Sequence, residues 1–301
     1  MKCLFLYNPN SGAGTIEKKL GYICRTLKKK YEQVDAVATV SGDDMTQKAR
    51  QGAAEYDAIV FSGGDGSFNR VLQGIGNSGV HLGYLPAGTA NDVAKSLCIP
   101  KNIKRALKIV TDGCVKNLDC MLVNGSHYCM YIAAAGAFTQ VTYSTPQKYK
   151  RALGKLAYAI EGLKNNMKLD VFPVRITCGD RTIEDSAVFL FVLNGRSVAG
   201  FPVNRDASMA DGLLETAVVR QAHKPNLRQK IGAYFSMAAL FLRGVKVRRR
   251  NIETLYGKKV EICTRDDVVW DFDGEEGIRG NITVETLEGH VKMFVPKRKK
   301  V

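Results

Sequence analysis

The sequence predicts two domains of different class: an α/β domain with a parallel sheet and, after it, an antiparallel β-sandwich domain. Three observations predict this. Strand-like and helix-like segments alternate in the first part of the chain, loops of small residues follow the strands there, and short β-rich runs take over after about residue 115. The length of 301 residues suits two domains of about 150 residues each. We place them at 1–125 and 126–301, with the C-terminal tail free to pack back on the first domain.

Four short apolar runs, each bounded by turn-forming residues, predict the strands of the first domain. They are Cys3–Tyr7, Val34–Val40, Asp57–Phe61 and Leu82–Leu85. After the first run, apolar side chains recur at helical spacing at Ile16, Leu20, Ile23, Leu27 and Tyr31. Further helices are expected through Phe68–Leu72 and over Asn91–Leu97. Strands separated by helices in this way form parallel sheets that are covered on both faces.

Short β-rich runs predict the strands of the second domain. They are Met121–Val123, Val171–Cys178, Val188–Leu193, Leu214–Val219, Lys259–Cys263 and His290–Val295. Closely repeated short strands are typical of an antiparallel sandwich or barrel. Two helical stretches interrupt them, near Gly154–Met167 and near Leu227–Leu242.

Composition and charge exclude several classes of protein and indicate an anionic partner. Lys and Arg number 44 and Asp and Glu 29, so the net charge is +15, and 45% of residues are hydrophobic. This balance excludes a disordered tail, a collagen and a small disulfide scaffold. The eight cysteines include no Cys-x-x-Cys pair, which favours reduced thiols in a cytosolic protein. The first apolar run is too short for a secretory leader, and no window is long enough to span a membrane, so any membrane contact is expected to be peripheral.

Three loops of small residues follow predicted strands, at the edge where open α/β sheets bind ligands. They are Asn8–Gly14, Gly63–Ser67 and Gly88–Asp92. Glycine lets backbone amides approach an anion, and the helix after each loop adds its positive end. Taken singly, each loop could also be a tight turn or a set of helix caps. Together they favour a nucleoside triphosphate, although neither the Walker loop nor the dinucleotide fingerprint is present.

In this combination the chain resembles the diacylglycerol kinase catalytic family, which includes bacterial lipid kinases and sphingosine kinases. The matching motifs are Asn8-Pro9-x-Ser11-Gly12, Gly63-Gly64-Asp65-Gly66-Ser67-x-Asn69, Gly88-Thr89-x-Asn91-Asp92-x-Ala94, Ser197-Val198-Ala199-Gly200-Phe201, Asp211-Gly212-Leu213-Leu214 and Asp273-Gly274-Glu275. They occur in family order over nearly the whole chain. The resemblance implies a first domain like that of phosphofructokinases and NAD kinases.

The resemblance also implies which residues bind ATP. In such kinases the first two loops wrap the phosphates, and single residues after two other strands touch the nucleotide. The implied residues are Asn8, Pro9, Asn10, Ser11, Gly12, Thr39, Gly64, Asp65, Gly66, Ser67, Phe68, Asn69, Arg70 and Thr89. Asp65 is expected to serve the site of the nucleotide-bound Mg²⁺.

The Asp-Gly-Glu segment of the second domain is expected to face the γ-phosphate. Asp273 is the first choice for the general base that takes the proton from a lipid hydroxyl, and Glu275 is the runner-up or a nucleotide contact. Without the family, Asp273-Gly274 also fits a hairpin turn.

A structural Mg²⁺ is a further implication of the resemblance. Its ligands would be the Asp211 carboxylate and the backbone carbonyls of Ser208 and Leu213, an oxygen-only set that suits this ion. Ala210 replaces the first residue of a frequent Asp-Asp pair, which weakens the expected site. Ala13 likewise replaces a frequent lysine of the first loop, and Lys18 or Lys19 on the following helix would partly compensate for it.

We therefore expect a cytoplasmic, peripherally membrane-associated lipid kinase that uses ATP and Mg²⁺. Its acceptor would be diacylglycerol, with phosphatidylglycerol or a sphingoid base as alternatives; a homodimer is left open. Two basic clusters support a lipid surface: Arg243–Arg250, which follows an apolar stretch at Phe235–Leu242, and Lys297–Lys300; Lys148–Lys155 is a third. These charges would also fit a simply solvated surface. The competing classes are a basic nucleic-acid-binding protein, although no such signature is present, and an ATP-binding protein without transfer activity.

Overall fold

The computed structural model describes residues 1–9, 16–137 and 169–297, and the chain divides into two compact units. The first unit contains Met1–Cys120, Ser208–Asp211 and Leu287–Val301. The second contains Met121–Ala207 and Gly212–Thr286. The chain crosses between the units within two strands, at residues 120–121 and 286–287, and outside strands on either side of Ser208–Asp211. We describe each unit by itself.

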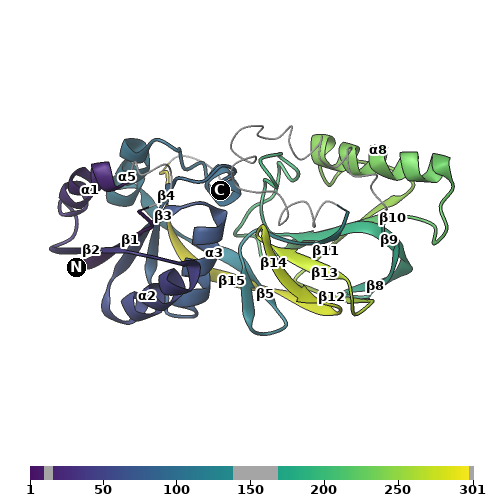
Figure 1. Ribbon diagram of the computed structural model, residues 1–301, viewed down its shortest axis with the longest axis horizontal. Helices are drawn as coiled ribbons and strands as arrows, with labels where there is room; N and C mark the ends of the chain where they lie inside the picture. The colour runs from purple at the N-terminus through teal and green to yellow at the C-terminus, as the bar shows by residue number, and fades with distance from the viewer. Residues whose placement is uncertain (10–15, 138–168, 298–301) are drawn as a thin grey trace. The chain divides into compact units, whose positions relative to one another are not determined.

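A parallel sheet forms the centre of the first unit (Figure 1). Its strand order is β2-β1-β3-β4-β15, and each neighbouring pair is parallel. The strands are β1 (Lys2–Tyr7), β2 (Gln33–Ala38), β3 (Ala58–Gly63), β4 (His81–Pro86) and the last part of β15 (Ile282–Val295). Apolar side chains fill β3, which is buried at all six positions, because helices cover the sheet.

Helices cover the two faces of this sheet. They are η2 (Glu17–Lys19), α1 (Leu20–Leu27), α2 (Gly42–Glu55), α3 (Asp65–Ile75), α4 (Asp92–Ser96) and α5 (Ile103–Asp112). α1 packs beside α5 on one face, and α2 beside α3 on the other (Figure 1). The aromatic rings of Phe61, Phe68 and Tyr84 stack or meet edge to face beneath the loops that follow β3 and β4, with centroids 5.1–5.4 Å apart. These rings give the loops a rigid base.

Antiparallel strands form the second unit. They are the end of β5 (Cys114–Val123), β6 (His127–Cys129), β7 (Ile132–Gly136), β8 (Phe172–Cys178), β9 (Arg181–Leu193), β10 (Leu214–Arg220), β11 (Ile252–Gly257), β12 (Lys259–Thr264), β13 (Val269–Phe272), β14 (Glu275–Arg279) and the start of β15. The long β9 pairs with β8 through its first half and with both β7 and β10 through its second half. The core includes Trp270, whose indole N–H donates to the Gly280 carbonyl oxygen at 2.8 Å.

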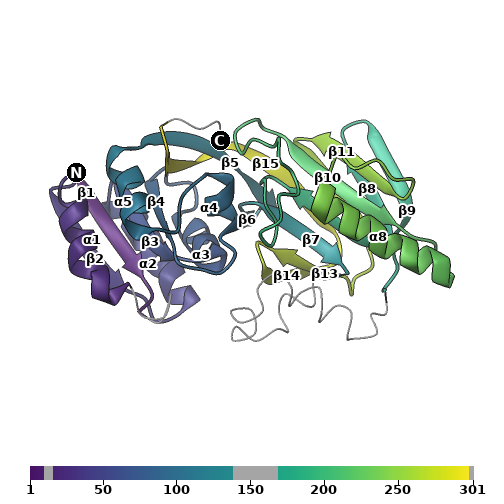
Figure 2. The ribbon, with the colours of Figure 1, turned by 90° about the horizontal axis from the view of Figure 1, so that it is seen from above.

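The helix α8 (Leu227–Arg243) lies against the sheet at β9 and β10 (Figures 1 and 2). A capping box of Asn226 and Gln229 fixes its first turn. Its buried face includes Met237 and Leu240, whereas Phe235 and Leu242 are each 62% exposed. The helix is therefore apolar on both its sheet-facing side and part of its outer side.

The predicted fold class is confirmed: a parallel α/β sheet is followed by an antiparallel sandwich-like unit. One assignment is corrected. The run His290–Val295, which we expected among the antiparallel strands, is the end of β15 and lies beside β4 in the first unit, with Met293 opposite Leu82. The predicted helix near Gly154–Met167 and the basic cluster Lys148–Lys155 lie outside the described residues. Within the described ranges, no helix is long and apolar enough to cross a membrane.

Candidate active site

Two glycine loops of the first unit meet backbone to backbone where β3 and β4 end. A Cβ atom on Gly64 would lie 3.2 Å from the Cα of Gly88, and one on Gly88 would lie 2.5 Å from the Cα of Gly64. Neither distance leaves room for a side chain. The pairing of the two loops therefore explains why both positions are glycine, and it brings two of the three predicted phosphate loops together.

The side chain of Asn91 holds the second of these loops closed. Its Oδ1 accepts hydrogen bonds from the Gly88 amide at 3.0 Å and the Tyr84 hydroxyl at 3.2 Å, and its Nδ2 donates to the Gly88 carbonyl at 2.8 Å. Asn91 is 1% exposed and has a left-handed backbone, with φ of 51°. Burial and the neighbouring Asp65 and Asp92 carboxylates raise the pKa of Tyr84 well above its ordinary value, so its hydroxyl remains a donor.

Asp65 joins the two loops through a third contact. It is the first residue of α3, and its Oδ1 accepts a hydrogen bond from the Val93 amide, in α4, at 3.2 Å. The helical bonds of α3 begin with the Phe68 amide, which donates to the Gly64 carbonyl. The amides of Gly66 and Ser67 lie in the first turn, where the helix itself supplies no acceptor. This helix start can therefore offer two amides and the positive end of a dipole to a phosphate.

The predicted nucleotide-binding residues differ in their accessibility. Thr89 is exposed, and the segment Gly64–Ser67 is half-buried. Phe68 and Asn69 are buried beneath the loop and support it. Thr39 is only 1% exposed, and its hydroxyl donates to the Tyr7 carbonyl at 3.3 Å. Its side chain therefore fixes β2 to β1 in this structure.

Arg70 is half-buried and is already engaged by α2. Its guanidinium pairs with the Asp43 carboxylate at 2.8 Å, and it lies against Gly42, where a Cβ would come 2.8 Å from the Arg70 Nε. In the first loop, Asn8 and Pro9 are half-buried at the end of β1. Asn10, Ser11 and Gly12 lie outside the described residues.

Asp273, in the second unit, lies in a tight turn and has a buried carboxylate. The residue is 3% exposed and has a φ of 54°, followed by Gly274 with a φ of 90°. Its two carboxylate oxygens accept backbone hydrogen bonds from Met130 at 2.6 Å, Tyr131 at 2.9 Å and Ile132 at 3.2 Å. We call this arrangement the amide cradle.

Two further contacts strengthen the amide cradle. The Asp273 amide donates back to the Ile132 carbonyl at 3.0 Å, and the Cys129 thiol lies 3.2 Å from the Asp273 Oδ1. Burial, followed by the charge of Asp273, raises the pKa of Cys129 well above its ordinary value, so this thiol stays protonated. The carboxylate of Asp273 thus organises the segment between β6 and β7.

Glu275, two residues further on, has a different environment. It begins β14 and is exposed, and among the described residues no ion pair engages it. The Asp271 carboxylate holds the turn between them through the Gly274 amide at 2.8 Å. Of the two carboxylates predicted for catalysis in this segment, only that of Glu275 is exposed to a ligand.

The predicted structural magnesium site offers one exposed carboxylate. Ser208 and Asp211 belong to the first unit and Leu213 to the second, so only the first two can be described together. Asp211 is exposed, and Gly212 has a φ of 71°. Within the described residues no group of three acidic, histidine or cysteine side chains could hold a metal. The predicted donors are all oxygen atoms, the ligand type that Mg²⁺ takes in proteins.

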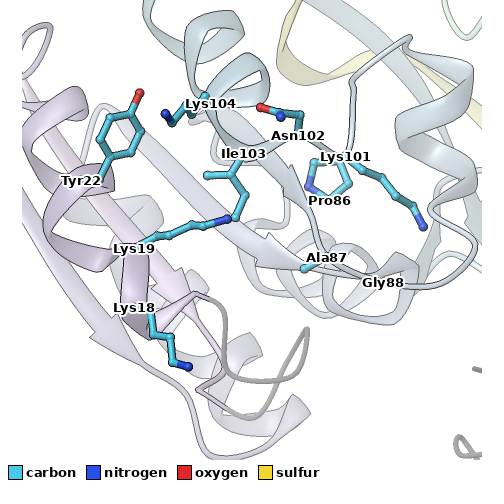
Figure 3. Close-up of a pocket in the computed structure, with 10 residues that line it drawn as sticks. All are labelled: Lys18, Lys19, Tyr22, Pro86, Ala87, Gly88, Lys101, Asn102, Ile103 and Lys104. Carbon is cyan, nitrogen blue, oxygen red and sulfur yellow. The ribbon is translucent and has the colours of Figure 1, made fainter.

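A cavity of about 600 Å³ opens beside the Gly88–Asp92 loop, between the start of α1 and the start of α5 (Figure 3). Gly88 forms part of its wall, and four lysines line it: Lys18, Lys19, Lys101 and Lys104. The sequence reasoning did not identify these lysines as a group, because Lys19 and Lys101 are far apart in the chain. It identified Asn91 only as a helix cap or polar neighbour, without the contacts that hold the loop.

Protein-family models match both halves of the chain. Residues 2–123 match the diacylglycerol kinase catalytic domain. Residues 132–295 match the YegS C-terminal NAD kinase beta sandwich-like domain.

Individual relatives give the same result over the full length. A diacylglycerol kinase of Staphylococcus saprophyticus is 30% identical over 297 residues, which cover 97% of this chain and 94% of that one. A diacylglycerol kinase of Bacillus subtilis is 29% identical, with 98% and 96% covered. Among solved structures, a Bacillus anthracis protein assigned as a diacylglycerol kinase superposes with a TM-score of 0.81 at 27% identity, over 98% of this chain and 95% of that one.

Proposed function

The chain belongs to the diacylglycerol kinase family of lipid kinases, and we propose that it transfers the γ-phosphate of ATP to the free hydroxyl of 1,2-diacylglycerol, giving phosphatidic acid. The observation that carries this proposal is the contact of Gly64 with Gly88. It builds a surface of backbone amides at the ends of β3 and β4, which suits a polyphosphate.

The nucleotide is assigned to the first unit. The amides of Gly66 and Ser67 and the hydroxyl of Thr89 would hold the phosphates, and the Asn8–Gly12 loop would cover them. The Asp65 carboxylate would hold the nucleotide-bound Mg²⁺. When bound, the ion offsets phosphate charge. The residues of the chain contribute the positions of the loops, which Asn91 and Asp65 fix before ATP arrives.

For the general base we now favour Glu275 over Asp273, the first choice from the sequence. A carboxylate accepts about four hydrogen bonds, and the amide cradle already occupies most of the capacity of Asp273. Glu275 is exposed and can meet a substrate hydroxyl. In the reaction the hydroxyl oxygen bonds to the γ-phosphorus, the bond to the β-phosphate oxygen breaks, and the proton passes to the carboxylate. ADP is the leaving group.

We also propose a structural Mg²⁺ at Asp211, with the Ser208 and Leu213 carbonyls as partners. The exposed carboxylate and the turn at Gly212 support it. This ion would stabilise the segment rather than take part in transfer. A stability measurement with and without Mg²⁺, on the wild type and on Asp211→Asn, tests it: the ion should raise the midpoint of unfolding in the wild type only.

The reaction is tested by radiolabelled phosphate transfer from ATP in mixed micelles. The micelles would contain diacylglycerol, phosphatidylglycerol, sphingosine or no added lipid, with wild type, Glu275→Gln and Asp273→Asn compared throughout. Transfer to diacylglycerol that Glu275→Gln abolishes would support both the acceptor and the base. Transfer to another lipid would replace diacylglycerol as the acceptor, and full activity of Glu275→Gln would remove its assigned role.

Peripheral membrane association at the cytoplasmic face is proposed for α8. Its outer side carries four exposed apolar residues at helical spacing: Leu227, Ile231, Phe235 and Leu242, which are 73%, 45%, 62% and 62% exposed. Exposed arginines lie at the end of the helix and just after it. No ion pair among the described residues engages these side chains, which are Arg243, Arg248, Arg249 and Arg250. An apolar stripe beside basic residues suits an anionic lipid surface.

Vesicle flotation with and without anionic lipid tests this surface. Phe235→Gln should weaken binding about tenfold or more, because inserting a phenylalanine side chain contributes roughly 1.5–3 kcal/mol. The matched control is Tyr256→Gln, which removes an aromatic side chain that is 52% exposed elsewhere, on β11. Equal binding by both variants would remove α8 from the membrane contact.

A further inference from the structure

Four exposed lysines line one cavity although they come from two distant segments. Lys18 and Lys19 end η2, and Lys101 and Lys104 flank the start of α5. Figure 3 shows Lys19 and Lys104 extending into the space between α1 and α5 from opposite walls, with Lys18 and Lys101 nearer its margins. We call this cavity the lysine pocket. All of its residues belong to the first unit.

Among the described residues, no acidic side chain pairs with the lysines of the lysine pocket. None of the four lysines forms an ion pair with another described residue, and no acidic side chain lines the cavity. The Lys101 ammonium donates to the Thr89 carbonyl at 2.9 Å, and the Lys104 ammonium lies 5.7 Å from the Tyr22 ring centre. These neutral contacts orient two ammonium groups and leave their charges available. Four like charges gathered in this way favour an anion between them.

The backbone of the pocket wall has the same preference. α5 begins in this wall, with the Asn102 side chain capping the Arg105 amide at 3.2 Å, and its first turn contains no acidic residue. The positive end of a ten-residue helix is thus added to the lysine charges. The lysines, the cavity and the helix are three separate observations that point to one class of ligand.

The lysine pocket shares one wall residue, Gly88, with the backbone surface proposed for the ATP phosphates. The ATP contacts proposed above come from Gly66, Ser67 and Thr89, and none of these lines the pocket. We propose that the lysine pocket is a second anion site, which binds a phosphate-bearing ligand other than the transferred ATP phosphates. A cavity of about 600 Å³ can hold a phosphorylated head group. The shared chemistry is a phosphate ester, from an anionic phospholipid or from a soluble metabolite.

The test compares a double variant with a control of equal charge. Lys19→Gln/Lys104→Gln removes the two lysines that extend into the pocket. Lys28→Gln/Lys108→Gln removes two exposed lysines that do not line the pocket. Lys28 directly follows α1, and Lys108 lies in α5. Each full-length protein is saturated with Mg²⁺ and a non-hydrolysable ATP analogue. Binding of glycerol 3-phosphate is then measured by calorimetry, and binding of phosphatidylcholine vesicles with and without phosphatidic acid by flotation.

The pocket variant should lose at least about tenfold in affinity for one of these two probes, because two charge-assisted contacts are removed. The control and the wild type should agree within about twofold. A loss confined to vesicles identifies a lipid head group as the source, and a loss confined to glycerol 3-phosphate a soluble ester. Equal loss in both double variants overturns the proposal, since general charge would then explain binding. It is also overturned if the wild type binds neither probe, or if the pocket variant loses affinity for the ATP analogue by the same factor.

This inference does not depend on the lipid acceptor. Failure of diacylglycerol phosphorylation would leave the phosphate binding of the lysine pocket intact, and loss of that binding would leave the transfer reaction measurable with Lys19→Gln/Lys104→Gln.

Discussion

The glycine loops of the first unit and the amide cradle of the second use backbone amides in opposite ways. At Gly64 and Gly88 the absence of side chains brings two backbones together and leaves the amides of Gly66 and Ser67 at a helix start without helical acceptors. Around Asp273 three amides converge on a carboxylate of the protein itself. We propose that the first arrangement binds an external anion, whereas the second already contains an internal one.

This difference teaches how to interpret a charged residue in a catalytic motif. A buried carboxylate that accepts several amide hydrogen bonds stabilises a turn, since removing it would leave those donors unsatisfied. A neighbouring exposed carboxylate that accepts no such hydrogen bonds can contact a substrate. The comparison therefore separates the roles of Asp273 and Glu275, which lie two residues apart.

The largest effect is expected from Glu275→Gln. Removing a general base should lower kcat for lipid phosphorylation by about a hundredfold to ten-thousandfold. The exposed side chain makes no cradle contact, so the free energy of unfolding should change by less than about 0.5 kcal/mol. Steady-state kinetics and urea denaturation check the two halves. A large loss of stability would show that Glu275 also has a structural role, which would contradict the difference proposed between Asp273 and Glu275.

Gly88→Ala should break the close contact between Gly64 and Gly88. The added Cβ would meet the Gly64 Cα at 2.5 Å and the Asn91 Oδ1 at 2.7 Å, so the two loops must separate. A displacement of about 1 Å at the phosphates costs about a hundredfold in rate. Kinetics with varied ATP measure the loss.

Gly21→Ala is the matched control for that substitution, because a Cβ there would meet nothing within 4 Å. It should retain full activity and gain up to about 1 kcal/mol in stability, since Gly21 lies in α1. Wild-type activity of Gly88→Ala would show that the loops do not need their close contact.

Asp273→Asn tests the structural role that the comparison gives to the amide cradle. The new amide would point one NH₂ group at backbone donors, so at least one charge-assisted bond is lost. We expect the free energy of unfolding to fall by about 3 kcal/mol. Denaturation followed by Trp270 fluorescence measures the change. Unchanged stability together with lost activity would return the role of base to Asp273.

Cys129→Ala should have the smallest effect. The thiol is a weak donor to Asp273, and its loss removes that contact and a small buried volume. We expect a loss of about 1 kcal/mol in unfolding free energy and no change in kcat. An effect as large as that of Asp273→Asn would mean that the thiol, and not the amides, holds the carboxylate.

Local patterns explain which elements could be predicted. The strands β1, β3 and β4 are continuous apolar runs between turn residues and were therefore evident in the sequence. The helix α2 was not expected, because its buried face consists of Met45, Ala49 and Gly52, and two of these are too small to give an apolar periodicity. The end of β15 was recognised as a strand but given the wrong neighbours, since its partner β4 is distant in sequence.

In the site, too, local features could be predicted from the sequence and contacts between distant segments could not. Glycine loops after strands are local features, so Gly64, Asp65 and Thr89 could be identified before the structure. The burial of Asp273 could not, because its donors come from residues 130–132. Asn91 closes the Gly88–Asp92 loop only because its own backbone is left-handed. The neighbouring residues in the sequence do not impose that conformation, so the contact could not be predicted.

The course of β15 has a consequence for biosynthesis. Its last part occupies a parallel position beside β4, yet it leaves the ribosome long after the other strands of that sheet. Until then the growing chain presents β4 with an unpaired edge, which is a template for wrong pairing. The first unit, although it begins the sequence, is thus completed only after β15 has been synthesised. In a translating cell, sheet completion would depend on synthesis of β15 and on protection of the β4 edge until then.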